Sequence, residues 1–80
     1  MYSGDVRRVL VVDDERLISE TLATILSRKG YAARAAFSGQ EAIDVARVFE
    51  PQVLITDVVM TGMTGIEAAG EILCFLPSAR

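Results

Sequence analysis

Three aspartates in this sequence are placed where chemistry with a metal ion or a phosphoryl group is possible. Asp13 and Asp14 come directly after the apolar run 9–12, and Asp57 comes directly after the run 53–56. Carboxylate oxygens are hard ligands that suit Mg²⁺, which keeps some of its waters and can bridge to a phosphoryl oxygen. A carboxylate beside such an ion is also a competent nucleophile toward phosphorus and forms an aspartyl phosphate. These residue types favour a metal–carboxylate site if the fold brings the three side chains together.

The same residues also have a plainer interpretation. An acidic pair after a strand is usually only the cap of the following helix, and a single aspartate at a strand end is a weaker signal still. The combination is more specific than either feature alone, because both would lie at one edge of the predicted sheet.

Three segments are predicted to be strands: residues 7–12, 31–36 and 53–56. The first and third are apolar without alternation, which is typical of strands buried on both faces. The second is rich in alanine, a poor strand former.

Three segments are predicted to be helices: residues 16–29, 38–49 and 64–75. In the first, the apolar residues have helical spacing, at Leu17, Ile18, Leu22, Ile25 and Leu26. Each of the other two opens with a capping box, a Ser or Thr followed three residues later by Glu. The three helices are expected to end at or before Gly30, Pro51 and Pro77, respectively. Residues 58–64 are expected to be a loop.

The order strand–helix, repeated three times, predicts an α/β doubly wound fold. Right-handed crossovers between the strands give a parallel sheet with helices on both faces. In such sheets, ligands bind beyond the carboxyl ends of the strands, where the direction of winding reverses. Asp13, Asp14 and Asp57 would meet at that edge if the first and third strands are neighbours.

Composition excludes several classes of protein. The chain has 80 residues, enough for one small domain, and its net charge of -3 gives no case for nucleic-acid binding by a basic surface. It has no histidine, which excludes Ser-His-Asp and Cys-His catalysis and most zinc sites. Cys74 is the only cysteine, so we expect a reducing, cytoplasmic setting. The apolar run 9–12 is too short to span a membrane, and no membrane partner is expected.

The acidic segments and their neighbours resemble the receiver domain of bacterial response regulators in two-component signalling. The matching segments are VLVVDDE at 9–15, LITDVVM at 54–60, GMTG at 62–65, GY at 30–31 and SGQEA at 38–42. The resemblance runs from about Arg7 to Pro77. It implies a flavodoxin-like fold, truncated to three βα units with strand order 2-1-3.

By this resemblance, Asp57 is the phosphoacceptor, while Asp13 and Asp14 hold Mg²⁺ directly or through water. The backbone carbonyl of Val59 is implied as a further ligand of the ion. The implied phosphoryl donor is a phosphohistidine on a sensor histidine kinase or a phosphotransfer protein, with small acyl phosphates as substitutes. Such a domain promotes its own phosphorylation and dephosphorylation, but it is a switch and not a turnover enzyme.

Two departures from the family pattern stand out. Thr61 occupies a position where many receivers have proline, which implies a less rigid loop. The larger departure is length, because a complete receiver has five strands and takes a switch Thr or Ser and a lysine from the ends of the last two. We therefore expect residues 1–80 to be an incomplete receiver domain. Lys29, the only lysine, lies at the far end of the first helix, so we expect slow phosphorylation.

The expected truncation also leaves two surfaces uncovered, namely the edge of the third strand and the side of the first helix against which the last helix of a complete receiver packs. Uncovered strand edges pair readily with other chains, so self-association through these surfaces is expected. An interaction or dimerisation module that works without phosphorylation is therefore an alternative function; the missing lysine favours it and the intact aspartates disfavour it. An Mg²⁺-dependent aspartyl phosphohydrolase is disfavoured, because that class has an acid two residues after the nucleophile, where Val59 stands.

Overall fold

The structure, a computed structural model, describes residues 7–57 and 65–75. Its elements are β1 (Arg8–Val12), α1 (Arg16–Arg28), β2 (Ala32–Ala36), α2 (Gly39–Phe49), β3 (Val53–Thr56) and α3 (Gly65–Phe75). The predicted alternation of strands and helices is confirmed, and the predicted ends differ from the observed ones by at most a residue.

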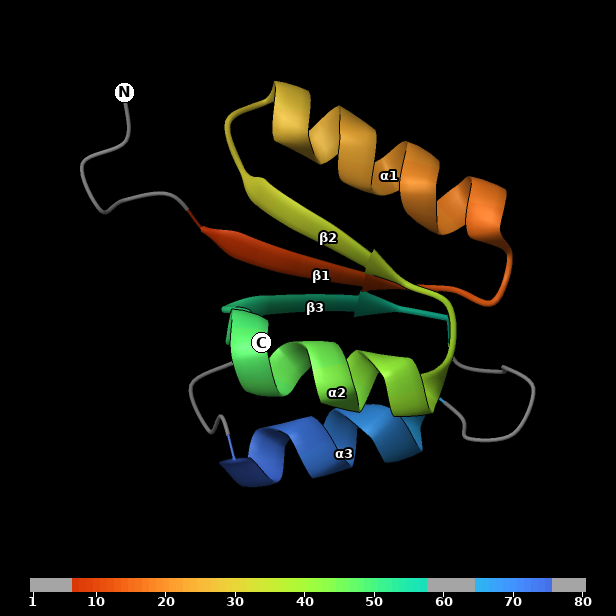
Figure 1. Ribbon diagram of the computed structural model, residues 1–80, viewed down its shortest axis with the longest axis vertical. Helices are drawn as coiled ribbons and strands as arrows, with labels where there is room; N and C mark the ends of the chain where they lie inside the picture. Colours follow the sequence, from red (N-terminus) through yellow and green to blue (C-terminus); the bar gives the residue numbers. More distant parts are fainter. Residues whose placement is uncertain (1–6, 58–64, 76–80) are drawn as a thin grey trace.

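The strands form one parallel sheet in the order β2-β1-β3, which confirms the expected doubly wound arrangement. Helix α1 covers one face of the sheet, and α2 and α3 lie together on the other (Figure 1). In the register, Val9 pairs with both Ala33 and Val53, and Val12 pairs with both Ala36 and Thr56. Central β1 therefore sets the position of both neighbours.

The side chains of β1 alternate between two apolar cores. Leu10 and Val12 pack with Ile43 of α2 and Ile72 of α3, and all four are at most 2% exposed. Val9 and Val11 belong to a second cluster on the α1 face of the sheet. Burial on both faces explains why the strand is apolar without alternation from Val9 to Val12.

The predicted capping box of α2 is present, with one difference in its bonds. The Glu41 N–H donates to Ser38 Oγ at 3.1 Å, as expected for a helix that begins after Ser38. The Glu41 carboxylate, however, accepts from the Phe37 N–H at 2.7 Å and so holds the residue before the cap. Thr64 of the second predicted box lies outside the described residues.

Helix α1 forms where its apolar spacing predicts, but it does not bury the residues that carry that spacing. Its buried side chains are Ser19 and Ala23, and Leu26 packs partly buried against the same cluster. Leu17 is 77% exposed, and Ile18 and Ile25 are nearly half exposed. The small side chains turned toward the sheet let the helix backbone lie close to it. No helix among residues 7–57 and 65–75 is both long and apolar enough to cross a membrane.

Two glycines give a matched test of backbone conformation. Gly30 follows α1 with φ +100, whereas Gly70 lies within α3, and an added Cβ would meet nothing within 4 Å at either position. Gly30→Ala is expected to destabilise the fold by about 1–2 kcal/mol, because an L-residue is strained at that φ. Gly70→Ala is expected to stabilise it by up to about 1 kcal/mol, because alanine favours the helix. Chemical denaturation followed by circular dichroism measures the free energy of unfolding of both variants. A change of the same sign in that free energy for the two substitutions would contradict this account.

Candidate functional site

The ends of β1 and β3 lie side by side at the carboxyl edge of the sheet. Val12 and Thr56 are the last residues of the two strands and are paired in the register. The Asp57 N–H donates to the Val12 carbonyl at 3.0 Å, and the Asp13 N–H donates to the Ala36 carbonyl at 3.1 Å. The backbone ladder therefore continues one residue beyond each strand and fixes the main chain of both aspartates.

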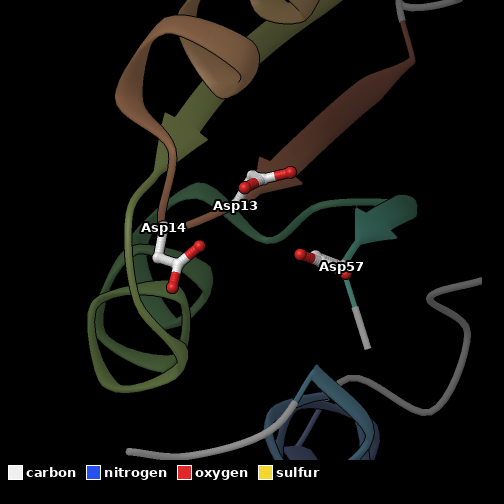
Figure 2. A group of neighbouring side chains, drawn as sticks. All are labelled: Asp13, Asp14 and Asp57. Atoms are coloured by element: carbon white, nitrogen blue, oxygen red, sulfur yellow. The ribbon is translucent and has the colours of Figure 1, made fainter. Parts of the chain in front are cut away.

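The three predicted site aspartates come together at this edge. Asp13, Asp14 and Asp57 each offer a carboxylate oxygen, and these oxygens lie within 4.8 Å of one another. Figure 2 shows their side chains extending from the ends of β1 and β3 toward a shared space. The geometric expectation from the sequence, that two separate strand ends bring the three carboxylates together, is confirmed.

The cluster has the dimensions and chemistry of a site for a hard divalent cation. Mg²⁺ binds oxygen at about 2.0–2.1 Å in octahedral geometry, so adjacent ligand oxygens would be about 2.9 Å apart and opposite ones about 4.2 Å apart. Oxygens that lie within 4.8 Å of one another would have to move by no more than about 2 Å, through side-chain rotation, to reach these separations. Asp13 is half-buried, while Asp14 and Asp57 are exposed, which leaves room for the water ligands that Mg²⁺ retains. The residues present therefore fit such an ion.

Asp13 also makes a bond to the start of α1. Its Oδ1 accepts from the Glu15 N–H at 3.0 Å, a local turn of the kind that aspartate commonly forms with a backbone amide two residues on. Glu15, at the N-cap position, makes no capping bond with its own side chain. Asp13 therefore stabilises the turn before α1 without capping the helix itself, and its carboxylate keeps lone pairs with which it could also bind an ion.

Val59, the predicted backbone ligand, lies outside the described residues, as does the predicted loop 58–64 that contains it.

The structure places one further residue at this edge, Arg16, which the sequence analysis did not single out. Its guanidinium carbon lies 4.0 Å from the centre of the Phe37 ring. Arg16 begins α1 and Phe37 follows β2, so this contact is at the same edge of the sheet as the acidic cluster. The adjacency of Arg16 to the acidic run was the only sequence signal for it.

Comparison with known proteins identifies the family and supports the fold. The model of the response regulator receiver domain matches residues 9–76. Transcriptional regulatory protein PdtaR of Mycobacterium tuberculosis is 45% identical over 67 residues, which cover 82% of this chain and 33% of that protein. The chain thus spans about a third of the length of this curated relative.

Solved structures agree with the family match. Chemotaxis protein CheY4 of Vibrio cholerae has a TM-score of 0.84 at 32% identity, covering 91% of this chain and 61% of that one. Response regulator protein TrrA of Thermotoga maritima, in complex with Mg²⁺-BeF, has a TM-score of 0.83 at 37% identity, covering 94% of this chain and 65% of that one. Because the family match extends over most of its length and the flavodoxin-like strand order agrees with it, this chain belongs to the response regulator receiver domain family of two-component systems.

Proposed function

We propose that this chain is a phosphoacceptor in which Asp57 receives a phosphoryl group while Asp13, Asp14 and Asp57 hold Mg²⁺. The observation that carries the proposal is the convergence of the three carboxylates, within 4.8 Å, at the carboxyl edge of a parallel sheet. Receiver domains are signalling modules rather than turnover enzymes, and the function proposed is that of a switch. The Val59 carbonyl is proposed as a further ligand of the ion.

The proposed reaction is a single displacement at phosphorus. A carboxylate oxygen of Asp57 attacks the phosphorus of a phosphohistidine, and the new O–P bond forms as the P–N bond of the donor breaks. The donor imidazole leaves with the bonding electron pair and takes up a proton from solvent. Bound Mg²⁺ supplies the positive charge that neutralises the phosphoryl oxygens.

Two features of the described residues support this proposal. Asp57 is exposed, so a donor on another protein can approach it, while its amide is held by the Val12 carbonyl. Asp13 is half-buried and oriented by the Glu15 amide. Receiver domains interact with histidine kinases or phosphotransfer proteins, and we propose a sensor histidine kinase as the donor to this chain, in the cytoplasm.

Phosphorylation can be tested with a small acyl phosphate. Incubation with acetyl phosphate and Mg²⁺ is expected to add one phosphoryl group to the wild type, slowly, because the described residues place no lysine at this edge. Asp57→Asn is expected to abolish the gain in mass, since the amide is not a nucleophile toward phosphorus. Asp44→Asn, an exposed position on α2, is the matched control and should be labelled like the wild type. Intact mass spectrometry provides the readout, and equal labelling of Asp57→Asn would refute the proposal.

Metal binding gives a separate test. Asp13→Asn is expected to weaken the affinity for Mg²⁺ or Mn²⁺ by about tenfold or more, about 1.4 kcal/mol, because it removes one of three carboxylates. Asp44→Asn should leave the affinity unchanged. Calorimetric titration, or Mn²⁺ titration followed by electron paramagnetic resonance, measures the change. A phosphorylation-independent interaction module predicts no specific metal affinity, so identical binding by wild type and Asp13→Asn would favour that alternative.

A second candidate function, self-association, is favoured by one apolar surface. Val53 packs on the α1 side of the sheet, and Ile55, two residues further along β3 and therefore on the same side, is 41% exposed. Among the described residues, no strand pairs with the outer edge of β3. This edge and the exposed apolar residues of α1 together form the surface proposed to meet a second copy of the chain.

Sedimentation velocity at increasing protein concentration tests this candidate. The sedimentation coefficient of the wild type is expected to rise with protein concentration. Ile55→Lys should make this rise smaller, because a charged residue at a strand edge opposes pairing. Val48→Lys is the matched control, since Val48 is 86% exposed on α2, away from that surface. A compact monomer at every concentration would rule out this second function.

A further inference from the structure

The contact between Arg16 and Phe37 joins the two turns on either side of the acidic cluster. Arg16 is the first residue of α1 and follows the turn that carries Asp13 and Asp14, while Phe37 begins the turn between β2 and α2. The guanidinium carbon lies 4.0 Å from the ring centre, well within the range of a cation–π interaction. A contact of this kind restricts how the first of these turns moves relative to the second.

The backbone that carries the Phe37 ring is held by hydrogen bonds. Its N–H donates to the Glu41 carboxylate at 2.7 Å, within the capping box that begins α2. The residue before it, Ala36, accepts a hydrogen bond from the Asp13 N–H at 3.1 Å. The segment from Asp13 to Arg16 is therefore held at both of its ends, by the sheet ladder at Asp13 and by the stacked ring at Arg16.

Among the basic residues that the structure describes, Arg16 alone lies at the edge of the sheet where Asp13, Asp14 and Asp57 meet. The others belong to the opposite edge or to the middle of β2: Arg7 and Arg8 at the start of β1, Arg28 and Lys29 at the end of α1, Arg47 in the last turn of α2, and Arg34 in β2. Arg34 makes a similar contact with Phe49, at 5.1 Å, at the far end of α2. The chain thus contains a second stacked pair that serves as an internal control.

A guanidinium at the same edge of the sheet as three carboxylates would have two opposing effects on a bound divalent cation. Its charge repels the cation, which lowers affinity, and this repulsion is screened because Arg16 is exposed. Its stack on Phe37 orders the turn that presents Asp13 and Asp14, which raises affinity by removing part of the entropic cost of ordering that turn on binding. Substitution of the ring rather than of the arginine separates the two effects, because it leaves the charge in place.

We propose that the Arg16–Phe37 stack is a positioning device that orders the turn carrying Asp13 and Asp14 and thereby raises the affinity of the acidic site for divalent cations. The inference rests on the proposed function, since it concerns the metal site of that function. It assigns Arg16 and Phe37 to the site as positioning residues that act through the two aspartates and not as ligands.

The experiment is a double-mutant cycle on Mn²⁺ affinity. Phe37→Leu, which removes the ring but keeps an apolar side chain, is expected to weaken Mn²⁺ binding by about two- to fivefold, the ratio expected for an exposed cation–π pair. Phe37→Tyr keeps the ring and is expected to bind Mn²⁺ as the wild type does. In the Arg16→Gln background, Phe37→Leu is expected to have no further effect, because the stack is already absent. The amide of Glu15 is expected to exchange hydrogen faster in Phe37→Leu than in the wild type.

The controls distinguish positioning from a general loss of stability. Phe49→Leu removes the ring of the distant Arg34–Phe49 pair and is expected to leave Mn²⁺ affinity unchanged. Equal weakening by Phe49→Leu, an unchanged affinity in Phe37→Leu, or an undiminished effect of Phe37→Leu in the Arg16→Gln background would each overturn the inference. These results leave the proposed function standing if Asp13→Asn still weakens binding. Absence of any Mn²⁺ binding by the wild type would overturn both.

Discussion

The parallel pairing of β1 with β3 is the constraint on which the site depends. The Val12–Thr56 register puts the two strand ends level, so the next residues, Asp13 and Asp57, lie at one edge. A slip of one residue would move Asp57 by about 3.3 Å along the strand and turn its side chain to the other face of the sheet. The register is held by burial, since Leu10 with Leu54 faces one core and Val9 with Val53 faces the other.

Much of the fold could be predicted because its signals are local. Apolar runs mark β1 and β3, the Ser38–Glu41 spacing marks the start of α2, and Gly30 takes the positive φ that ends α1. The meeting of the aspartates was also predictable, because parallel strands end at a common edge and the strand order implied by the resemblance makes β1 and β3 neighbours. Topology does not give side-chain separations, so the closeness of the carboxylates had to come from the structure.

The features that escaped prediction depend on how helices are rotated against the sheet. The apolar spacing of α1 suggests a face of leucines and isoleucines, yet Ser19 and Ala23 are the side chains turned inward. That same rotation brings Arg16 over Phe37, a contact between residues far apart in the sequence that no local pattern specifies. The Asp13–Glu15 hydrogen bond is different, since aspartate before a helix is a known local signal, but the sequence leaves open whether such a residue serves the helix, the site or both.

The Glu15 amide, at the beginning of α1, is hydrogen-bonded to Asp13, so the start of this helix interacts directly with the charge of the carboxylate cluster. The positive end of the helix dipole lies at the same edge as three carboxylates, and one of them accepts directly from the amide of the N-cap residue, Glu15. Any change in the net charge of that group of acids alters the attraction between it and the helix terminus. A bound cation would weaken this attraction and an added phosphoryl dianion would strengthen it, so the charge held at the site would change how firmly the beginning of α1 is held.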